Sequence, residues 1–276
     1  VPGCSYIRLI GIKIQMTGSY GSDVSGMVLT NSADNLSADI DELPHHIVFD
    51  RCLFTHDEAM KGINDTINFD MDDSCILGCY FYNLYGAGTD GSNAIRTYTG
   101  HRLRIENNYM NCMGASYFLG DNAAREIEDV LFVHNWHYRP LAWDDGGHGT
   151  SKGSLETKAG LRVLIKENVF ENHWGNGAFQ AITLKSDGLF GPKCTRHVTV
   201  EGNLIKHAYM GMLVHVNGST PGAEVGPNRD FLIKNNLMYD LAQPKGIFMT
   251  VANAAGDEIL ERVQIINNTM PDGDLR

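Results

Sequence analysis

A short phrase that ends in asparagine returns about every thirty residues along this chain, a period typical of solenoid folds. In each copy alternating apolar residues precede the asparagine, as Val163 and Ile165 precede Asn168. Successive asparagines are separated by 27, 33, 35, 33 and 32 residues. They are Asn108, Asn135, Asn168, Asn203, Asn236 and Asn268. Because no single repeat of this size can bury its apolar face alone, neighbouring repeats must stack on one another.

Each copy predicts a half-buried strand followed by a turn. Apolar and polar residues alternate with period two, which is the period of a strand and not of a helix. Asparagine suits the turn because it tolerates left-handed backbone angles and its amide can bond to the main chain. Stacked amides can also bond one another along the solenoid axis. Cys52 and Cys79 stand where asparagine stands later, with steps of 27 and 29 residues up to Asn108, so we expect them to stack on adjacent coils.

A second family of short strands lies between the asparagine strands, at residues 26–30, 66–70, 94–98, 154–158, 181–185, 211–215 and 246–250. The separation is too short for a crossover helix, so the chain is predicted to be an all-β, right-handed parallel β-helix of about nine coils. Alternation assigns one set of residues to the interior. They are Met27, Leu29, Ile67, Phe69, Ile95, Leu155, Ile182, Leu184, Met212, Val214, Ile247 and Met249.

Length and composition fit one such domain spanning residues 1–276. The pattern begins already under way at Val1 and stops just after an asparagine turn, so we expect a piece of a longer chain. The formal net charge of −11 argues against nucleic acid and anionic membranes as general partners, although a local basic cluster could still bind an acidic sugar. No run of apolar residues approaches the length of a membrane span. The spacing of the six cysteines fits neither a disulfide scaffold nor a zinc site.

The residues between the interior positions of the second family should face outward and form a stripe along the solenoid. They are Asn68, Asp70, Arg96, Tyr98, Glu156, Lys158, Thr183, Lys185, Leu213 and His215. A linear polymer could lie along this stripe, with Tyr98 offering a face to a sugar ring. The alternative is a solvated surface whose charges pair across coils.

Two other segments are candidates for a site. The acidic run Asp70, Asp72 and Asp73 could hold calcium through oxygen ligands, or could be an aspartate-rich turn. The irregular stretch 136–152 is aromatic, acidic and glycine-rich, which fits either a binding loop on a rigid scaffold or a disordered excursion. Its candidate binding residues are Trp143, Asp144, Asp145 and His148.

Two reactions on polysaccharides are compatible with these residue types. Hydrolysis needs a pair of carboxylates across the glycosidic bond. The available ones are Asp70, Asp121, Asp144, Asp145 and Glu156. Elimination needs a base next to a uronate and a cation or calcium ion that neutralises the uronate carboxylate, for which Arg96, Lys158 and Lys185 are suitable.

Through nearly its whole length the chain resembles the right-handed parallel β-helix proteins of the pectate-lyase-like superfamily, and in particular large secreted bacterial members. The segments that carry this resemblance are 88–108, a glycine- and aspartate-bearing turn before an asparagine strand, and 135–158. The calcium-dependent pectate lyases have a Trp-Ile-Asp-His phrase, which residues 48–51 match only at Asp50, and their Arg-x-Pro-x-x-Arg phrase is absent. The tandem aspartates of polygalacturonases are not recognisable either. The resemblance therefore implies the fold and an extracellular location, but it transfers no catalytic residue.

These observations predict a secreted, carbohydrate-active solenoid that binds, and can cleave, a polysaccharide. The predicted catalytic residues are Arg96, Glu156, Lys158 and Lys185. The predicted substrate-binding residues are Asp70, Tyr98, Trp143, Asp144, Asp145, His148 and His215. The alternative prediction is a non-catalytic structural or adhesive solenoid whose rod shape is itself the function.

Overall fold

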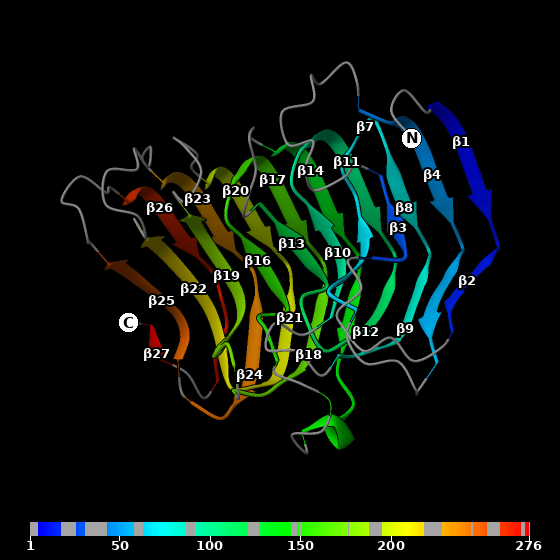
Figure 1. Cartoon of the computed structure of the whole chain (residues 1–276). Helices are drawn as coiled ribbons and strands as arrows, with labels where there is room; N and C mark the ends of the chain where they lie inside the picture. Colours follow the sequence, from blue (N-terminus) through cyan, green and yellow to red (C-terminus); the bar gives the residue numbers. More distant parts are fainter. Residues whose placement is uncertain are drawn as a thin grey trace.

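The computed structural model describes residues 5–17, 26–30, 43–57, 63–86, 92–120, 127–144, 148, 151–175, 177–187, 195–217, 228–243, 245–252, 260–271 and 274–275. Within these ranges almost every element is a short strand, and all paired strands are parallel. The strands form three sheets that wind around a common axis, from β1 at the N-terminal end to β26 at the C-terminal end (Figure 1). The predicted parallel β-helix is confirmed.

The first sheet contains the strands that precede the asparagine turn. Its ladder is continuous, since each strand pairs with its equivalent one coil further on, as Val163 pairs with Val198 and Val198 with Phe231. Its ten strands are β1 (Ser5–Ile10), β4 (His45–Asp50), β7 (Met71–Asp72), β8 (Cys75–Leu77), β11 (Gly100–Glu106), β14 (Ile127–Val133), β17 (Gly160–Lys166), β20 (Thr195–Glu201), β23 (Asn228–Lys234) and β26 (Leu260–Ile266).

The second sheet contains the strands that follow the asparagine turn. The sequence pattern did not separate this sheet from the first, because only two residues intervene between the two strands of each coil. Its eight strands are β2 (Lys13–Met16), β5 (Leu53–His56), β9 (Tyr80–Leu84), β12 (Tyr109–Cys112), β15 (Trp136–Tyr138), β18 (Val169–His173), β21 (Leu204–Ala208) and β24 (Leu237–Leu241).

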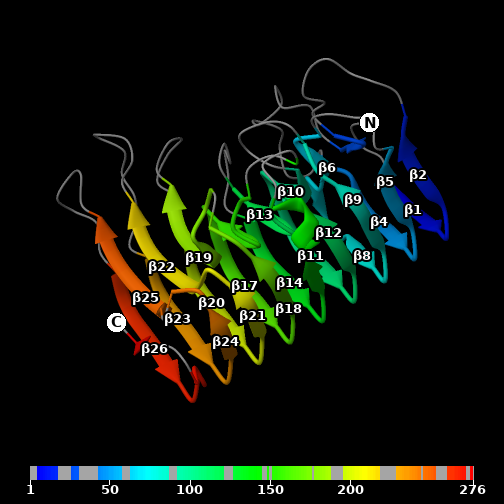
Figure 2. The same cartoon turned by 90° about the horizontal axis from the view of Figure 1, so that it is seen from below.

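The third sheet contains the second strand family of the sequence. Figure 2 views the successive coils from below, with strands of this sheet alongside those of the other two. Its nine strands are β3 (Val28–Leu29), β6 (Asp65–Asn68), β10 (Asn93–Thr97), β13 (Tyr117–Leu119), β16 (Leu155–Thr157), β19 (Gln180–Asp187), β22 (Met210–Asn217), β25 (Lys245–Ala252) and β27 (Asp274–Leu275).

A buried asparagine ladder holds the turn between the first two sheets. The Oδ1 atom of Asn168 accepts from the backbone N–H of Asn135 at 2.8 Å and from its amide Nδ2 at 3.1 Å. Asn168 in turn donates to Asn203 Oδ1 and to the carbonyl of Phe132, at 2.9 Å each. Bonds of this kind repeat from Asn108 to Asn268, so each amide satisfies polar groups that burial would otherwise leave without partners.

The cysteines continue this ladder as the sequence predicted. Cys79 donates its backbone N–H to Asn108 Oδ1 at 2.7 Å, and its Sγ accepts from the Cys52 N–H at 3.3 Å. Both thiols are buried, and burial raises the pKa of Cys79 to about 12. Cys79 is therefore a neutral member of the ladder.

The sequence pattern predicts that the ladder asparagine itself adopts the left-handed backbone conformation, and the structure shows a different residue there. The residue with positive φ is the one just before each ladder asparagine, such as Asn107 at 55° and Glu167 at 53°. The ladder asparagine itself is held by its amide bonds inside the coil. In each turn, therefore, the residue before the asparagine adopts the left-handed conformation, and the asparagine makes the buried hydrogen bonds.

The solenoid interior is apolar, and most of the predicted interior positions are fully buried. Ile67, Ile95 and Ile182 occupy equivalent positions in three different coils and are 0% exposed. The prediction for the first member of the family is wrong. Val28 pairs with Ile67, whereas Leu29 pairs with Asn68 and is 50% exposed. A slip of one residue reverses every side chain of a strand, and β3 is too short for its own pattern to fix the register. Met249 has a side chain outside the described part of the structure.

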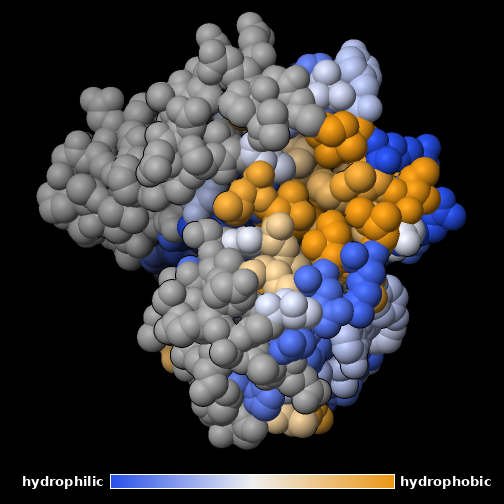
Figure 3. Space-filling view, turned by 45° about the vertical axis from the view of Figure 1, so that its right-hand side comes forward, coloured by the Kyte–Doolittle hydropathy of each residue, from blue (hydrophilic) through white to orange (hydrophobic). Residues whose placement is uncertain are grey.

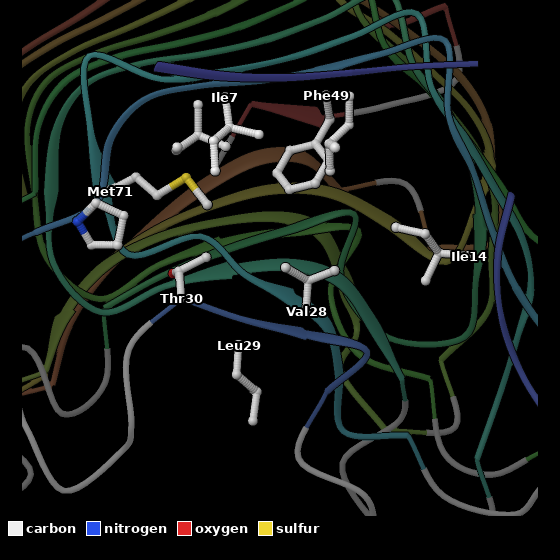
Figure 4. Close-up of a pocket in the computed structure, with 10 residues that line it drawn as sticks. Ile7, Ile14, Val28, Leu29, Thr30, Phe49 and Met71 are labelled. Atoms are coloured by element: carbon white, nitrogen blue, oxygen red, sulfur yellow. The ribbon is translucent and has the colours of Figure 1, made fainter. Parts of the chain in front are cut away.

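Apolar residues also gather at the N-terminal end of the solenoid (Figure 3). A pocket there is lined mainly by aliphatic and aromatic side chains from β1 to β7, with Thr30 among them (Figure 4). Ile7, Val28, Phe49 and Met71 converge on this pocket from different strands (Figure 4). It is the end of the apolar interior, and its lining lacks the charged groups that a catalytic site would need.

Connection lengths determine where functional groups can collect. The turn from the first sheet to the second is tight, as from Glu106 to Tyr109. The connections that flank the third sheet vary in length. Only two residues separate Thr97 from Gly100, whereas the connection from Tyr138 to Leu155 is long and contains the short 3-10 helix η3 (Leu141–Trp143).

Candidate functional site

The candidate site lies on the outer face of the nine-stranded sheet. Arg96 on β10 pairs in register with Phe118 on β13, and Phe118 pairs with Glu156 on β16. Glu156 pairs with Thr183 on β19. Residues that are far apart in sequence thus form one row, because parallel pairing repeats the same outward position in each coil.

The aromatic ring of Phe118 is the centre around which cationic groups collect. The Arg96 guanidinium lies 4.8 Å from the centre of this ring and 4.5 Å from the centre of the Tyr98 ring. The ammonium groups of Lys152 and Lys158 lie 5.1 and 5.3 Å from the Phe118 ring. Phe118 itself is only 1% exposed. Such cation–π contacts are favourable, and more so where water is excluded.

An ion pair extends this group across the next coil. Lys185 lies 2.7 Å from Glu156, with side-chain exposures of 20% and 11%. His215 pairs in register with Lys185 and is half-buried. We call Arg96, Phe118, Lys152, Glu156, Lys158 and Lys185 the Phe118 cluster.

Asp65 supports the cluster from β6. Its carboxylate accepts from Asn93 Nδ2 at 2.7 Å and faces the Arg96 guanidinium at 3.4 Å. Burial raises the pKa of Asp65, and the nearby charge of Arg96 opposes this shift. Asp65 therefore fixes the position of Arg96.

Asp70 was predicted to lie on the open stripe, but it is only 3% exposed. Its Oδ1 atom accepts from the backbone N–H groups of Tyr98 at 2.6 Å and Thr99 at 3.2 Å. Burial raises the pKa of Asp70 to about 6, although these two hydrogen bonds act in the opposite direction. Asp70 thus shapes the turn that presents Tyr98.

The residues predicted for the 136–152 stretch occupy a different neighbourhood. Trp143 is buried and stacks on His148, with ring centres 5.7 Å apart. Tyr85, which follows β9, contacts the ring of Trp143 at 5.3 Å and that of His148 at 4.7 Å. Asp144 is exposed, and Asp145 lies outside the described residues. These ring contacts anchor the stretch beside the end of β9.

The acidic run at residues 70–73 does not form one cation site. Asp70 bonds to the backbone as described above, whereas Asp72 and Asp73 each lie 2.5 Å from Arg102. Across the described ranges no group of three or more histidine, cysteine or acidic side chains has an arrangement suited to a metal ion. The aspartates have structural partners instead.

Two members of the cluster were not recognised from the sequence. Phe118 lies on β13, a strand of only three residues, and Lys152 precedes β16. The signal for β13 was nevertheless present. One strand of the second family must lie between Asn108 and Asn135, because every coil needs one, and Tyr117-Phe118-Leu119 is the apolar segment available there.

This arrangement is suited to an anionic ligand. The cations of the cluster can bind the carboxylate of an acidic sugar, whereas the Phe118 ring is only 1% exposed and is not open to the ligand. Three carboxylates described at this face, Asp65, Asp70 and Glu156, already accept bonds from protein groups. The site therefore fits the binding of an anionic sugar better than it fits hydrolysis by a pair of carboxylates.

Comparisons with known proteins support the fold class. No protein-family model matches the chain, and no curated protein matches its sequence. A similar solved structure is that of the Streptococcus pneumoniae surface protein and adhesin PfbA, with a TM-score of 0.52 and 10% identity. The alignment covers 90% of this chain and 67% of that one. At this identity the likeness shows the parallel β-helix fold alone. Among the described residues no helix has the length and apolarity needed to cross a membrane.

Proposed function

We propose that this protein is a secreted polysaccharide-binding β-helix that holds an acidic glycan at the Phe118 cluster. The observation that supports this proposal is the arrangement of Arg96, Lys152 and Lys158 around one buried aromatic ring. The protein as a whole has a net charge of −11. A group of cations on one face is therefore a local exception, and it favours the binding of an anionic ligand at that face. A uronate unit offers such an anion next to an apolar ring face.

Cleavage by elimination is the reaction that fits this ligand best. A base removes the C5 proton of the uronate, the C–H electron pair forms the C4–C5 double bond, and the C4–O bond breaks with its oxygen gaining a proton. Arg96 would neutralise the uronate carboxylate. One lysine of the cluster, in its neutral form, would accept the C5 proton, and a second, protonated lysine would donate a proton to the leaving oxygen.

A second candidate is adhesion without turnover. The similar structure belongs to a protein described as a surface protein and adhesin, and a solenoid can present a ligand-binding face without catalysis. Both candidates use the same face and the same ligand chemistry. They differ in whether the bound glycan is cleaved.

The test measures binding and turnover on polygalacturonate, alginate and neutral glucans, with and without calcium. Lys185→Met should weaken binding of the uronic-acid polymers by about tenfold, because it removes one charge of the cluster. Added salt should weaken binding as well. Unsaturated products that absorb ultraviolet light identify a lyase, new reducing ends without them identify a hydrolase, and binding without products identifies the adhesive alternative.

Lys206→Met is the matched control. Lys206 on β21 lies 3.1 Å from Glu171, with side-chain exposures of 21% and 14%, close to those of the Lys185–Glu156 pair. The two variants should therefore lose similar stability, whereas only Lys185→Met should lose uronate binding. Equal losses of binding in both variants, or uronate binding that Lys185→Met leaves unchanged, would contradict the proposal.

A further inference from the structure

A second surface with recognisable chemistry lies on the outer face of the eight-stranded sheet. Five aromatic residues project from three neighbouring strands, β9, β12 and β15. They are Tyr80, Tyr82, Tyr109, Trp136 and Tyr138, which we call the aromatic row. The alternate residues of these strands, Phe81, Met110 and His137, point inward and are at most 1% exposed. The row is therefore an outward surface and not part of the core.

Register aligns the row with the solenoid axis. Tyr80 pairs with Tyr109, and Tyr109 pairs with Trp136. Tyr80, Tyr82 and Trp136 are 52%, 53% and 45% exposed, which is unusual for a set of adjoining aromatic side chains. Successive members are about one strand spacing apart, roughly 4.8 Å. This spacing is close to the length of one sugar unit in an extended 1,4-linked glycan.

The rings present two kinds of contact. Tyr80 and Tyr109 are nearly parallel, with centres 4.7 Å apart and an interplanar angle of 26°. Trp136 is almost perpendicular to Tyr109, at 5.4 Å and 89°. The indole thus adds a ring plane that runs along the row, while the stacked phenols add hydroxyl groups. A pyranose needs both contacts, because it has apolar C–H faces and hydroxyl edges.

The charges of this surface favour a neutral ligand. The Tyr109 hydroxyl is protonated at neutral pH and can donate a hydrogen bond, and burial raises its pKa further, to about 12. Trp136 Nε1 donates to Glu171 at 3.1 Å, which fixes the indole. The charge of Glu171 is balanced by Lys206 at 3.1 Å. The aromatic row therefore lacks the positive field of the Phe118 cluster.

We propose that the aromatic row binds a neutral, extended glycan of the β-1,4-linked type, with the sugar chain parallel to the solenoid axis. Trp136 stacks on the C–H face of one unit, and Tyr80, Tyr82 and Tyr109 contact its neighbours. The row is separate from the Phe118 cluster, which lies on another sheet. The protein would then bind two chemically different glycans on two of its faces.

The experiment titrates the whole chain with cellohexaose, xylohexaose and mannohexaose and follows tryptophan fluorescence and heat of binding. The chain has three tryptophans, of which Trp143 is 6% exposed and Trp136 is 45% exposed. We expect at least one of these oligosaccharides to bind and to change the fluorescence. Trp136→Ala should weaken binding by about tenfold, and Tyr80→Ala by about fivefold.

The controls separate this site from folding and from the first proposal. Tyr6→Ala removes a tyrosine that is 76% exposed on the ten-stranded sheet, and it should leave binding unchanged. Trp136→Phe keeps an aromatic ring and should keep most of the affinity. Tyr80→Ala, at a side chain that is 52% exposed, tests the site even if Trp136→Ala unfolds. Lys185→Met should reduce uronate binding without changing neutral-glycan binding.

Three results would overturn the inference. The first is no binding of any of the three oligosaccharides, and the second is unchanged affinity in both Trp136→Ala and Tyr80→Ala. The third is a concentration-dependent dimer in sedimentation that Trp136→Ala converts to a monomer, which would make a second copy of the chain the occupant. None of these results bears on uronate binding at the Phe118 cluster, so the two proposals can fail separately.

Discussion

The outer faces of the nine-stranded and eight-stranded sheets differ although the same coils build both. On the first, Phe118 is 1% exposed, and the charged groups around it are ion-paired or partly buried. On the second, Tyr80 and Trp136 are about half exposed and rest on strands whose inward residues are buried. A buried polar cluster links ligand binding to stability, since its members are also each other's partners. On the exposed aromatic row, a substitution can change ligand binding with little effect on stability.

The largest expected effect tests the burial of the first face. Phe118→Ala should lower the free energy of unfolding by about 3 to 5 kcal/mol, because it removes a buried ring together with its contacts to the surrounding cations. Urea denaturation measures this loss. Phe118→Leu is the control and should cost much less, because most of the volume is kept. If Phe118→Ala were as stable as the natural chain, the Phe118 cluster would not contribute to stability, and this difference between the two faces would disappear.

The second effect tests whether stability on this face depends on pH. The pKa of Asp70 is about 6 in the folded protein, against an ordinary value of 3.8. The folded state therefore binds the proton more tightly, and this contribution to stability is lost as pH rises from about 4 to about 6.

Asp70→Asn should remove this loss, because the asparagine Oδ1 can still accept from Tyr98 and Thr99. We expect the variant to be more stable than the natural chain at pH 7 by up to about 3 kcal/mol, with little gain at pH 3.5. Denaturation curves at the two pH values measure the difference. A gain that is the same at both values would show that ionisation of Asp70 is not its cause.

The smallest effect belongs to the aromatic row. Tyr80→Ala should change the free energy of unfolding by no more than about 1 kcal/mol, since the side chain is 52% exposed and loses mainly its contact with Tyr109. Thermal unfolding measures this change, and Phe81→Ala on the same strand is the contrasting variant, because Phe81 is fully buried. A loss from Tyr80→Ala close to that from Phe81→Ala would mean that the row is structural.

Much of the fold could be predicted because the repeat encodes it locally. The asparagine spacing equals the length of a coil, and each asparagine stacks on its equivalent in the next coil. Strand alternation then assigns Ile67, Ile95 and Ile182 to the interior without further information. The same reasoning could have found the aromatic row, since Tyr80, Tyr109 and Trp136 each directly follow a ladder residue.

The solenoid, its period and the identity of the ladder residues follow from the amino-acid sequence alone, because they depend on interactions that recur at a fixed separation along the chain. The folded coils were needed to establish that Leu29 faces outward, that Asp70 is buried, and that Phe118 and Lys152 join Arg96. Those outcomes depend on the register of short strands and on how the longer connections return to the third sheet. A slip of a single residue reverses a strand's side chains, and nothing in a strand of two or three residues specifies that choice locally.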